Sequence, residues 1–231
     1  MNWVIRSAED IYNAVQDIGF LPFFANEVEG FSIEEHTPVE LWFTKQEGPW
    51  EWKGPVLRMG NCVYGKFFNG KAGFISTKWF PDFANFRRDG YDFDSREDDG
   101  LKVEMVDKNI YEELIKQKSV ISKVIRQRTG YWGKEGKGGF DTIMTRLQMQ
   151  TYAITCDFEY ETGKNGEPYG WGLARYTTPE LYLGKSFRNK VYKRTPEGSF
   201  DRMLKQLKKK FPDAKPVKIG KILGYKNKKY F

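Results

Sequence analysis

The stretch Ser119-Val-Ile-Ser-Lys-Val-Ile-Arg-Gln-Arg128 predicts a short helix, and it opens the part of the sequence that decides the fold. A second helix is expected from Phe140 to about Gln150, because apolar residues recur there at i, i+3, i+4 and i+7, the spacing of one helix face. Ahead of both, Asp107 to Gln117 predicts another helix. The order so far is therefore three helices in succession.

A β-hairpin is expected after these helices. The segments Thr151–Tyr160 and Tyr169–Thr177 are rich in β-branched and aromatic residues, which favour strands, and Gly163-Lys-Asn-Gly-Glu-Pro168 between them is turn-forming. Three helices and a hairpin are the order of a winged helix, a helix-turn-helix variant whose third helix can enter the DNA major groove. An ordinary α+β domain without a nucleic-acid partner is the alternative.

The first half of the sequence predicts the same order of elements. Ser7 predicts an N-cap for a helix that Gly19 ends, and two more helical stretches are expected at 37–43 and 52–59. Asn69-Gly70 between strand-forming residues predicts a type I′ hairpin turn. The two sets of elements lie about one hundred residues apart. The expected fold class is α+β, with tandem winged-helix units and a basic C-terminal helical segment.

These patterns predict three parts. Residues 1–95 would form the first winged-helix-like unit with an aromatic connector, and residues 96–180 the second winged-helix unit. Residues 181–231 would form a basic helix, at about 196–211, followed by a strand or tail from Val217.

The charge of the chain points to an anionic partner. Of its 231 residues, 38 are Lys or Arg and 31 are Asp or Glu, a formal net charge of +7. The excess gathers near the C-terminus, because the segment from Arg202 to Lys229 is rich in lysine and has Asp213 as its single acid. Such a segment commonly contacts phosphate, although a solubilising tail is the alternative.

Several classes of site are not expected. The two cysteines, Cys62 and Cys156, have no CxxC spacing, and His36 is the single histidine, so the sequence predicts no disulfide framework, no metal site and no cofactor. Neither a signal peptide nor a run of ~20 apolar residues is found, so we expect a cytoplasmic protein that does not span a membrane.

Duplex DNA is the expected partner. With the apolar face of the Phe140–Gln150 helix turned inward, its polar residues point outward, where Arg can read guanine and Thr can meet phosphate. The glycine-rich loop before this helix, the predicted second wing and the basic C-terminal helix supply further candidates. The residues expected to bind nucleic acid are Lys134, Lys137, Thr142, Thr145, Arg146, Lys164, Asn165, Lys205, Lys208 and Lys209.

Candidate catalytic residues are more scattered. Trp50 and Trp52 would stack on bases, and the carboxylates of Glu51 and Asp82 would act as general bases toward water. In the alternative, Arg87 and Arg88 pair with the acids of the connector and hold the two units together. Gln148 and Gln150 would orient one water between them, or would cap the helix end and bond to backbone.

Five segments resemble a known family. They are Gly65-Lys-Phe-Phe, Lys71-Ala-Gly-Phe-Ile-Ser76, Trp79-Phe-Pro, Asn85-Phe-Arg-Arg-Asp-Gly-Tyr-Asp-Phe-Asp94 and Leu147-Gln-Met-Gln-Thr-Tyr152. Across roughly residues 5 to 180 the sequence is similar to the bacterial AlkZ-related family, relatives of the AlkZ and YcaQ winged-helix DNA glycosylases. The resemblance implies tandem winged helices, DNA binding and excision of alkylated or crosslinked bases.

The sequence departs from those glycosylases at one point. They carry a Gln-x-Gln or Gln-x-Asp pair after an early Gly-Leu-Leu-like segment. The similar segment here, Gly19-Phe-Leu-Pro-Phe-Phe24, has Pro22 and Phe24 at the two positions, and neither side chain can position a water. We therefore expect a DNA-binding protein of glycosylase ancestry. An active base-excision glycosylase and a protein-interaction module are the alternatives.

Overall fold

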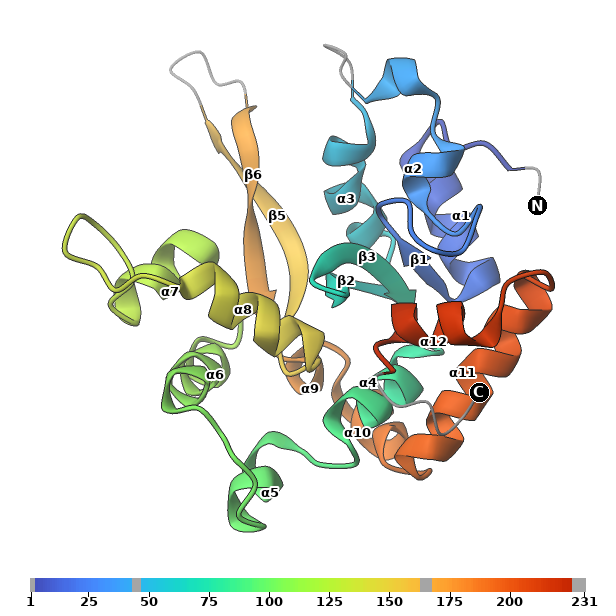
Figure 1. The fold of residues 1–231 in the computed structure, drawn as a ribbon. Helices are drawn as coiled ribbons and strands as arrows, with labels where there is room; N and C mark the ends of the chain where they lie inside the picture. Colours follow the sequence, from blue (N-terminus) through green and yellow to red (C-terminus); the bar gives the residue numbers. More distant parts are fainter. Residues whose placement is uncertain (1–2, 43–46, 163–167, 226–231) are drawn as a thin grey trace.

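A six-stranded antiparallel sheet runs through the centre of the protein, in the strand order β1-β3-β2-β5-β6-β4 (Figure 1). The structure is a computed structural model, and it describes residues 3–42, 47–162 and 168–225. Helices surround the sheet, so the fold is α+β, as the sequence predicts. Among the described residues, no helix is both long and apolar enough to cross a membrane.

The first half of the chain begins with a helix whose ends follow from two residues. The Ser7 hydroxyl accepts a hydrogen bond from the Asp10 backbone N–H at 3.2 Å, and Gly19 ends the helix at φ 95°. Both predictions are confirmed. The elements of this half are α1 (Ala8–Ile18), β1 (Phe20–Pro22), α2 (Ile33–His36), the 3₁₀ turn η1 (Val39–Leu41), α3 (Pro49–Arg58), β2 (Cys62–Phe68) and β3 (Lys71–Ser76).

The second half repeats this order. The predicted helix at 119–128 begins later than expected, at Ser122, because Val120 and Ile121 pair with Tyr176 and Arg175 as a short edge strand. The elements of this half are α6 (Met105–Gln117), β4 (Val120–Ile121), α7 (Ser122–Arg128), α8 (Phe140–Met149), β5 (Ile154–Thr162) and β6 (Pro168–Thr177).

The hairpin turn predicted at Asn69-Gly70 is confirmed. Asn69 and Gly70 have φ values of 53° and 78°, and a type I′ turn requires positive φ at both central residues. The turn joins β2 to β3, and Tyr64 on β2 then pairs with Thr155 on β5. This single pairing merges the two hairpins into one sheet.

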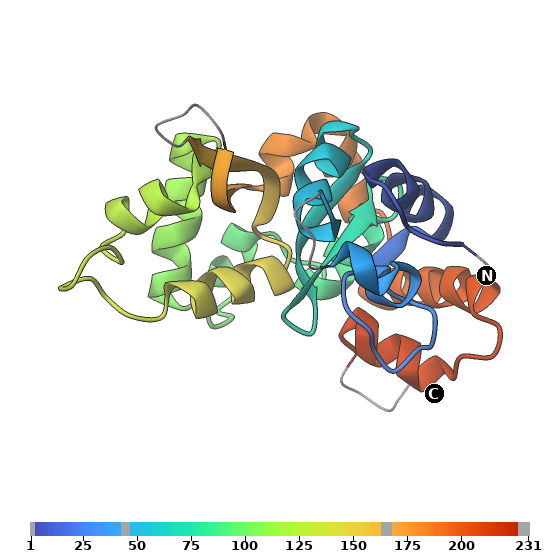
Figure 2. The same cartoon turned by 90° about the horizontal axis from the view of Figure 1, so that it is seen from above.

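The third helix of each half packs across the junction. Helix α8 lies against β2 of the first half, and α3 lies against β5 of the second half. Figure 2 shows the two halves side by side, with α11 and α12 against the first half. In the sequence, two helices lie between the halves, α4 (Phe80–Arg88) and α5 (Phe93–Asp98). Four helices follow the second half: α9 (Pro179–Tyr182), α10 (Gly184–Val191), α11 (Pro196–Lys210) and α12 (Pro216–Leu223).

The C-terminal helices contribute to the core of the first half. Phe187, Phe200, Leu207 and Ile219 are buried in the same cluster as α1 and the first hairpin, whereas α6, α7 and α8 enclose a smaller second core. The strand or tail expected from Val217 is instead the helix α12, because Pro216 begins a helix and Ile219, Ile222 and Leu223 form its buried face.

Candidate nucleic-acid interface

A pocket of about 770 Å³ opens beside α8, the helix predicted to contact DNA. We call it the α8 pocket. One wall is the polar face of α8, and the other comes from the C-terminal end of α4 and the residue that ends α12. Its lining consists of Phe86, Arg87, Asp141, Thr142, Thr145, Arg146, Met149, Gln150 and Gly224.

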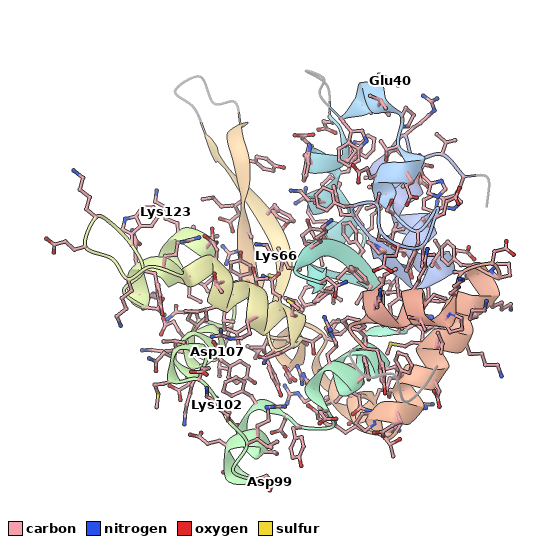
Figure 3. All side chains as sticks on the ribbon, viewed as in Figure 1. Glu40, Lys66, Asp99, Lys102, Asp107 and Lys123 are labelled. Carbon is pink, nitrogen blue, oxygen red and sulfur yellow. The ribbon has the colours of Figure 1, made fainter. Side chains whose placement is uncertain are left out.

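The first hairpin holds α8 in place. Lys66 donates its backbone N–H to Gln148 Oε1 at 3.1 Å, and its ammonium donates to Thr145 Oγ1 at 3.2 Å. Figure 3 labels Lys66 near α8 at the junction of the halves. A methyl group at Gly70 would lie 3.6 Å from Thr145 Cγ2, so the hairpin turn contacts the polar face of α8 directly.

Arg146 is held by a buried carboxylate. Its Nε donates to Asp107 Oδ2 at 2.8 Å, and its Nη2 donates to Asp107 Oδ1. The Asp107 side chain, labelled on α6 in Figure 3, is 6% exposed, whereas that of Arg146 is 38% exposed. The hydrogen bond to Asp107 raises the pKa of Arg146, so the guanidinium stays charged at the pocket wall.

Arg87 is the second cation of the pocket, and its surroundings differ. Its Nη2 donates to the Phe67 carbonyl at 2.7 Å, but its Nε is buried without a hydrogen-bond partner. Burial lowers the pKa of Arg87 to about 10. Within the described ranges, no carboxylate forms an ion pair with it.

The structure brings four predicted site residues together in the α8 pocket: Thr142, Thr145, Arg146 and Gln150. Lys134 and Lys137 are exposed in the loop before α8. Lys164 and Asn165, at the predicted wing tip, lie outside the described residues.

The lysines predicted on the C-terminal helix lie elsewhere. Lys205 and Lys209 are exposed on α11, which packs against α4 and α1. Lys208 donates to the carbonyls of Pro212 and Ala214 at 2.6 and 2.9 Å, so its ammonium holds the turn that follows the helix.

The four catalytic candidates are not gathered in one site. Glu51 accepts from the Gly48 backbone N–H at 2.9 Å and caps α3. Asp82 is buried on α4, where it pairs with Arg202 and accepts from Ser199 Oγ at 3.2 Å. Gln148 is 2% exposed. Of the four catalytic candidates, Gln150 is the one that lines the α8 pocket.

One side-chain prediction is corrected. Arg87 and Arg88 do not pair with the acids of the connector: Arg87 bonds to the Phe67 carbonyl, and Arg88 donates to Glu180 at 2.6 Å. The two tryptophans expected to stack on bases contact protein groups in this structure, and their stacking on bases stays a prediction. Trp52 is 5% exposed in the first core, and Trp50 stacks on Phe23 with ring centroids 5.1 Å apart.

Sequence reasoning missed Arg87, Asp107 and Lys66 as parts of this interface. No local pattern marks Asp107 or Lys66, because their partners lie on α8, far along the chain.

Comparison with known proteins gives a family match. A family model described as "AlkZ related" matches residues 5–224. No curated protein matches the sequence. Among solved structures, the Streptomyces sahachiroi DNA glycosylase AlkZ is 9% identical with a TM-score of 0.47, and the match covers 88% of this chain and 51% of that one. The chain thus spans about half the length of that glycosylase.

Proposed function

Because the chain belongs to the AlkZ-related family, we propose that it binds duplex DNA and takes part in DNA repair. One observation carries the proposal: the polar face of α8 lines an open pocket that contains two arginines and two threonines. Guanidinium and hydroxyl groups are common ligands of DNA phosphates and base edges. The exposed Lys134 and Lys137 extend this positive surface along the loop before α8.

The repeated element order supports tandem winged helices. In each half, a helix, a short strand, further helical segments and a hairpin follow one another; these segments are α2, η1 and α3 in the first half and α7 and α8 in the second. The short strand pairs with the second strand of its own hairpin in both halves, β1 with β3 and β4 with β6. Helix α8 is the recognition helix in this proposal. In this proposal residues 1–95 and 96–180 are the two units, and 181–231 are the basic C-terminal segment.

Base excision is the second candidate function. It is favoured by the family and by the position of Gln150, the one catalytic candidate that lies beside the proposed DNA-contacting face. An amide in that position can orient a water toward a sugar carbon. Glu51, Asp82 and Gln148 are held by other protein groups, so Gln150 is the first residue to test.

The test uses fluorescence anisotropy with a short duplex, intact or carrying an alkylated base, at 50 and 200 mM salt. A DNA-binding protein loses affinity steeply with salt, in proportion to its phosphate contacts. Heating the same samples in alkali breaks the strand wherever a base has been removed. Binding without strand breaks supports the first function, and breaks that Gln150→Ala abolishes support the second. Absence of binding at 50 mM salt contradicts both.

A further inference from the structure

We propose that the α8 pocket holds a phosphate group on Arg87, and that this phosphate belongs to the DNA backbone that passes along α8. The proposal rests on DNA binding as the proposed function and names one contact within it. Arg87 is half-buried, and no carboxylate pairs with its charge among the described residues.

The environment of Arg87 contrasts with that of two other arginines nearby. Arg146, across the pocket, is paired with Asp107, and Arg88, the next residue, donates to Glu180. Among the described residues Arg87 has one hydrogen bond, to the Phe67 carbonyl, and its guanidinium lies 5.3 Å from the Phe83 ring centre. Burying a charge without an ionic partner is unfavourable, and the lowered pKa of Arg87 reflects that cost. A bound anion would offset this unfavourable free energy.

Gly224 keeps space for this guanidinium. It ends α12 at φ 90°, and a methyl group there would lie 1.5 Å from Arg87 Nη1. Any larger residue would push the guanidinium from its place. The end of α12 therefore fixes the position of Arg87 at the pocket wall.

The rest of the lining suits an oxyanion. The hydroxyls of Thr142 and Thr145 and the amide of Gln150 supply hydrogen-bond donors on the α8 side. Asp141 is the one carboxylate of the lining, and it is paired with Arg126 at 2.6 Å. A guanidinium opposite hydroxyl donors binds phosphate with two parallel hydrogen bonds. Because α8 is the proposed recognition helix, a backbone phosphate of the duplex is the phosphate expected there.

The experiment measures the dependence of DNA affinity on salt for the wild type and Arg87→Gln. The logarithm of the association constant falls with the logarithm of the salt concentration, and loss of one phosphate contact makes this negative slope shallower by about 0.9. Between 50 and 200 mM salt, the dissociation constant of the wild type should therefore rise about threefold more than that of the variant. Lys185→Gln, an exposed cation on α10 away from the pocket, removes the same charge and should keep the wild-type slope.

A second variant and a second measurement test the phosphate site independently of the Arg87→Gln result. Gly224→Ala keeps the charge of Arg87 but displaces its guanidinium, so it should make the slope shallower as Arg87→Gln does. Thermal unfolding with inorganic phosphate or a deoxynucleoside monophosphate, against chloride of equal ionic strength, tests the site without DNA. Phosphate should raise the melting temperature of the wild type more than that of Arg87→Gln, because the general stabilisation by this salt is common to both.

The outcomes separate the site from the function. A wild type that binds DNA with the same slope as Arg87→Gln overturns the backbone contact. If the wild type does not bind DNA, but phosphate stabilises it more than Arg87→Gln, the proposed function fails and the phosphate site stands. If neither assay distinguishes Arg87→Gln from the wild type, the site itself is overturned.

Discussion

Arg88 Nη1 donates to Glu180 Oε1 at 2.6 Å, and this bond ties the helix between the two halves to the segment that follows the second hairpin. The Arg88 side chain has no exposed surface. It also donates to Thr151 Oγ1 and to the Thr151 carbonyl, at 3.2 and 2.8 Å, and to the Tyr192 hydroxyl at 2.9 Å. One buried guanidinium therefore connects α4, the α8–β5 loop, α9 and the end of α10.

Replacing Arg88 should destabilise the protein strongly. Arg88→Met leaves Glu180 partly buried without its cation, which typically costs about 3–5 kcal/mol in the free energy of unfolding. Urea denaturation followed by circular dichroism measures this change. Arg58→Ala is the matched control, since Arg58 pairs with Asp157 at 2.7 Å but both side chains are well exposed, and its loss should cost about 0–1 kcal/mol. Equal losses for the two variants would contradict the role assigned to burial.

Gln148 should prove structural. Its Oε1 accepts from the Lys66 backbone N–H and its Nε2 donates to the Met144 carbonyl at 3.2 Å, so both ends of the buried amide are bonded. Gln148→Ala leaves the Lys66 N–H unpaired, and we expect a loss of about 1–3 kcal/mol of stability. DNA affinity, measured below the unfolding transition, should change little.

Gln150 supplies the comparison for Gln148. Its side chain makes no hydrogen bond within the described residues and lies at the pocket. Gln150→Ala should therefore keep the stability of the wild type. The assignment is wrong if Gln150→Ala lowers the urea midpoint as much as Gln148→Ala does.

The ion pair between Arg146 and Asp107 should control DNA affinity. Arg146→Ala removes the guanidinium from the α8 face, and we expect a loss of about 1–3 kcal/mol in binding if it reads a base. Asp107→Asn keeps a hydrogen-bond acceptor but removes the competing negative charge, so affinity should rise. Anisotropy with one duplex measures both variants. Weaker binding by Asp107→Asn would mean that the carboxylate is needed to position Arg146.

Patterns of neighbouring residues were sufficient to predict the helix cap, the hairpin turn and the apolar helix face. The Ser7 cap, the Asn69-Gly70 turn and the apolar face of α8 each depend on residues within one or two turns of each other. These features are confirmed because the residues that mark them lie close together in the sequence.

The contacts that build the pocket could not be predicted in this way. Arg87 keeps its position because Gly224, at the far end of the chain, leaves room for its guanidinium, and Gln148 is buried because Lys66 offers a backbone N–H from the first hairpin. The pairing of Tyr64 with Thr155, which merges the two hairpins, is also a tertiary choice. Sequence spacing carries no information on which distant strand edges meet.

The buried thiol of Cys62 should make stability depend on pH above 8.5. Burial raises the pKa of Cys62 to about 12, whereas an unfolded cysteine titrates near about 8.5. A raised folded pKa gives stability that is complete below the unfolded pKa and is lost as pH rises toward the folded one. Between pH 8.5 and 10 the unfolded state releases this proton and the folded state keeps it, which lowers the free energy of unfolding by about 1.5 kcal/mol. Urea denaturation at pH 7.5, 8.5 and 10 measures the decline, and Cys62→Ala should remove about that amount of it. If the variant and the wild type decline equally, the Cys62 thiol is not protonated in the folded protein as its burial implies.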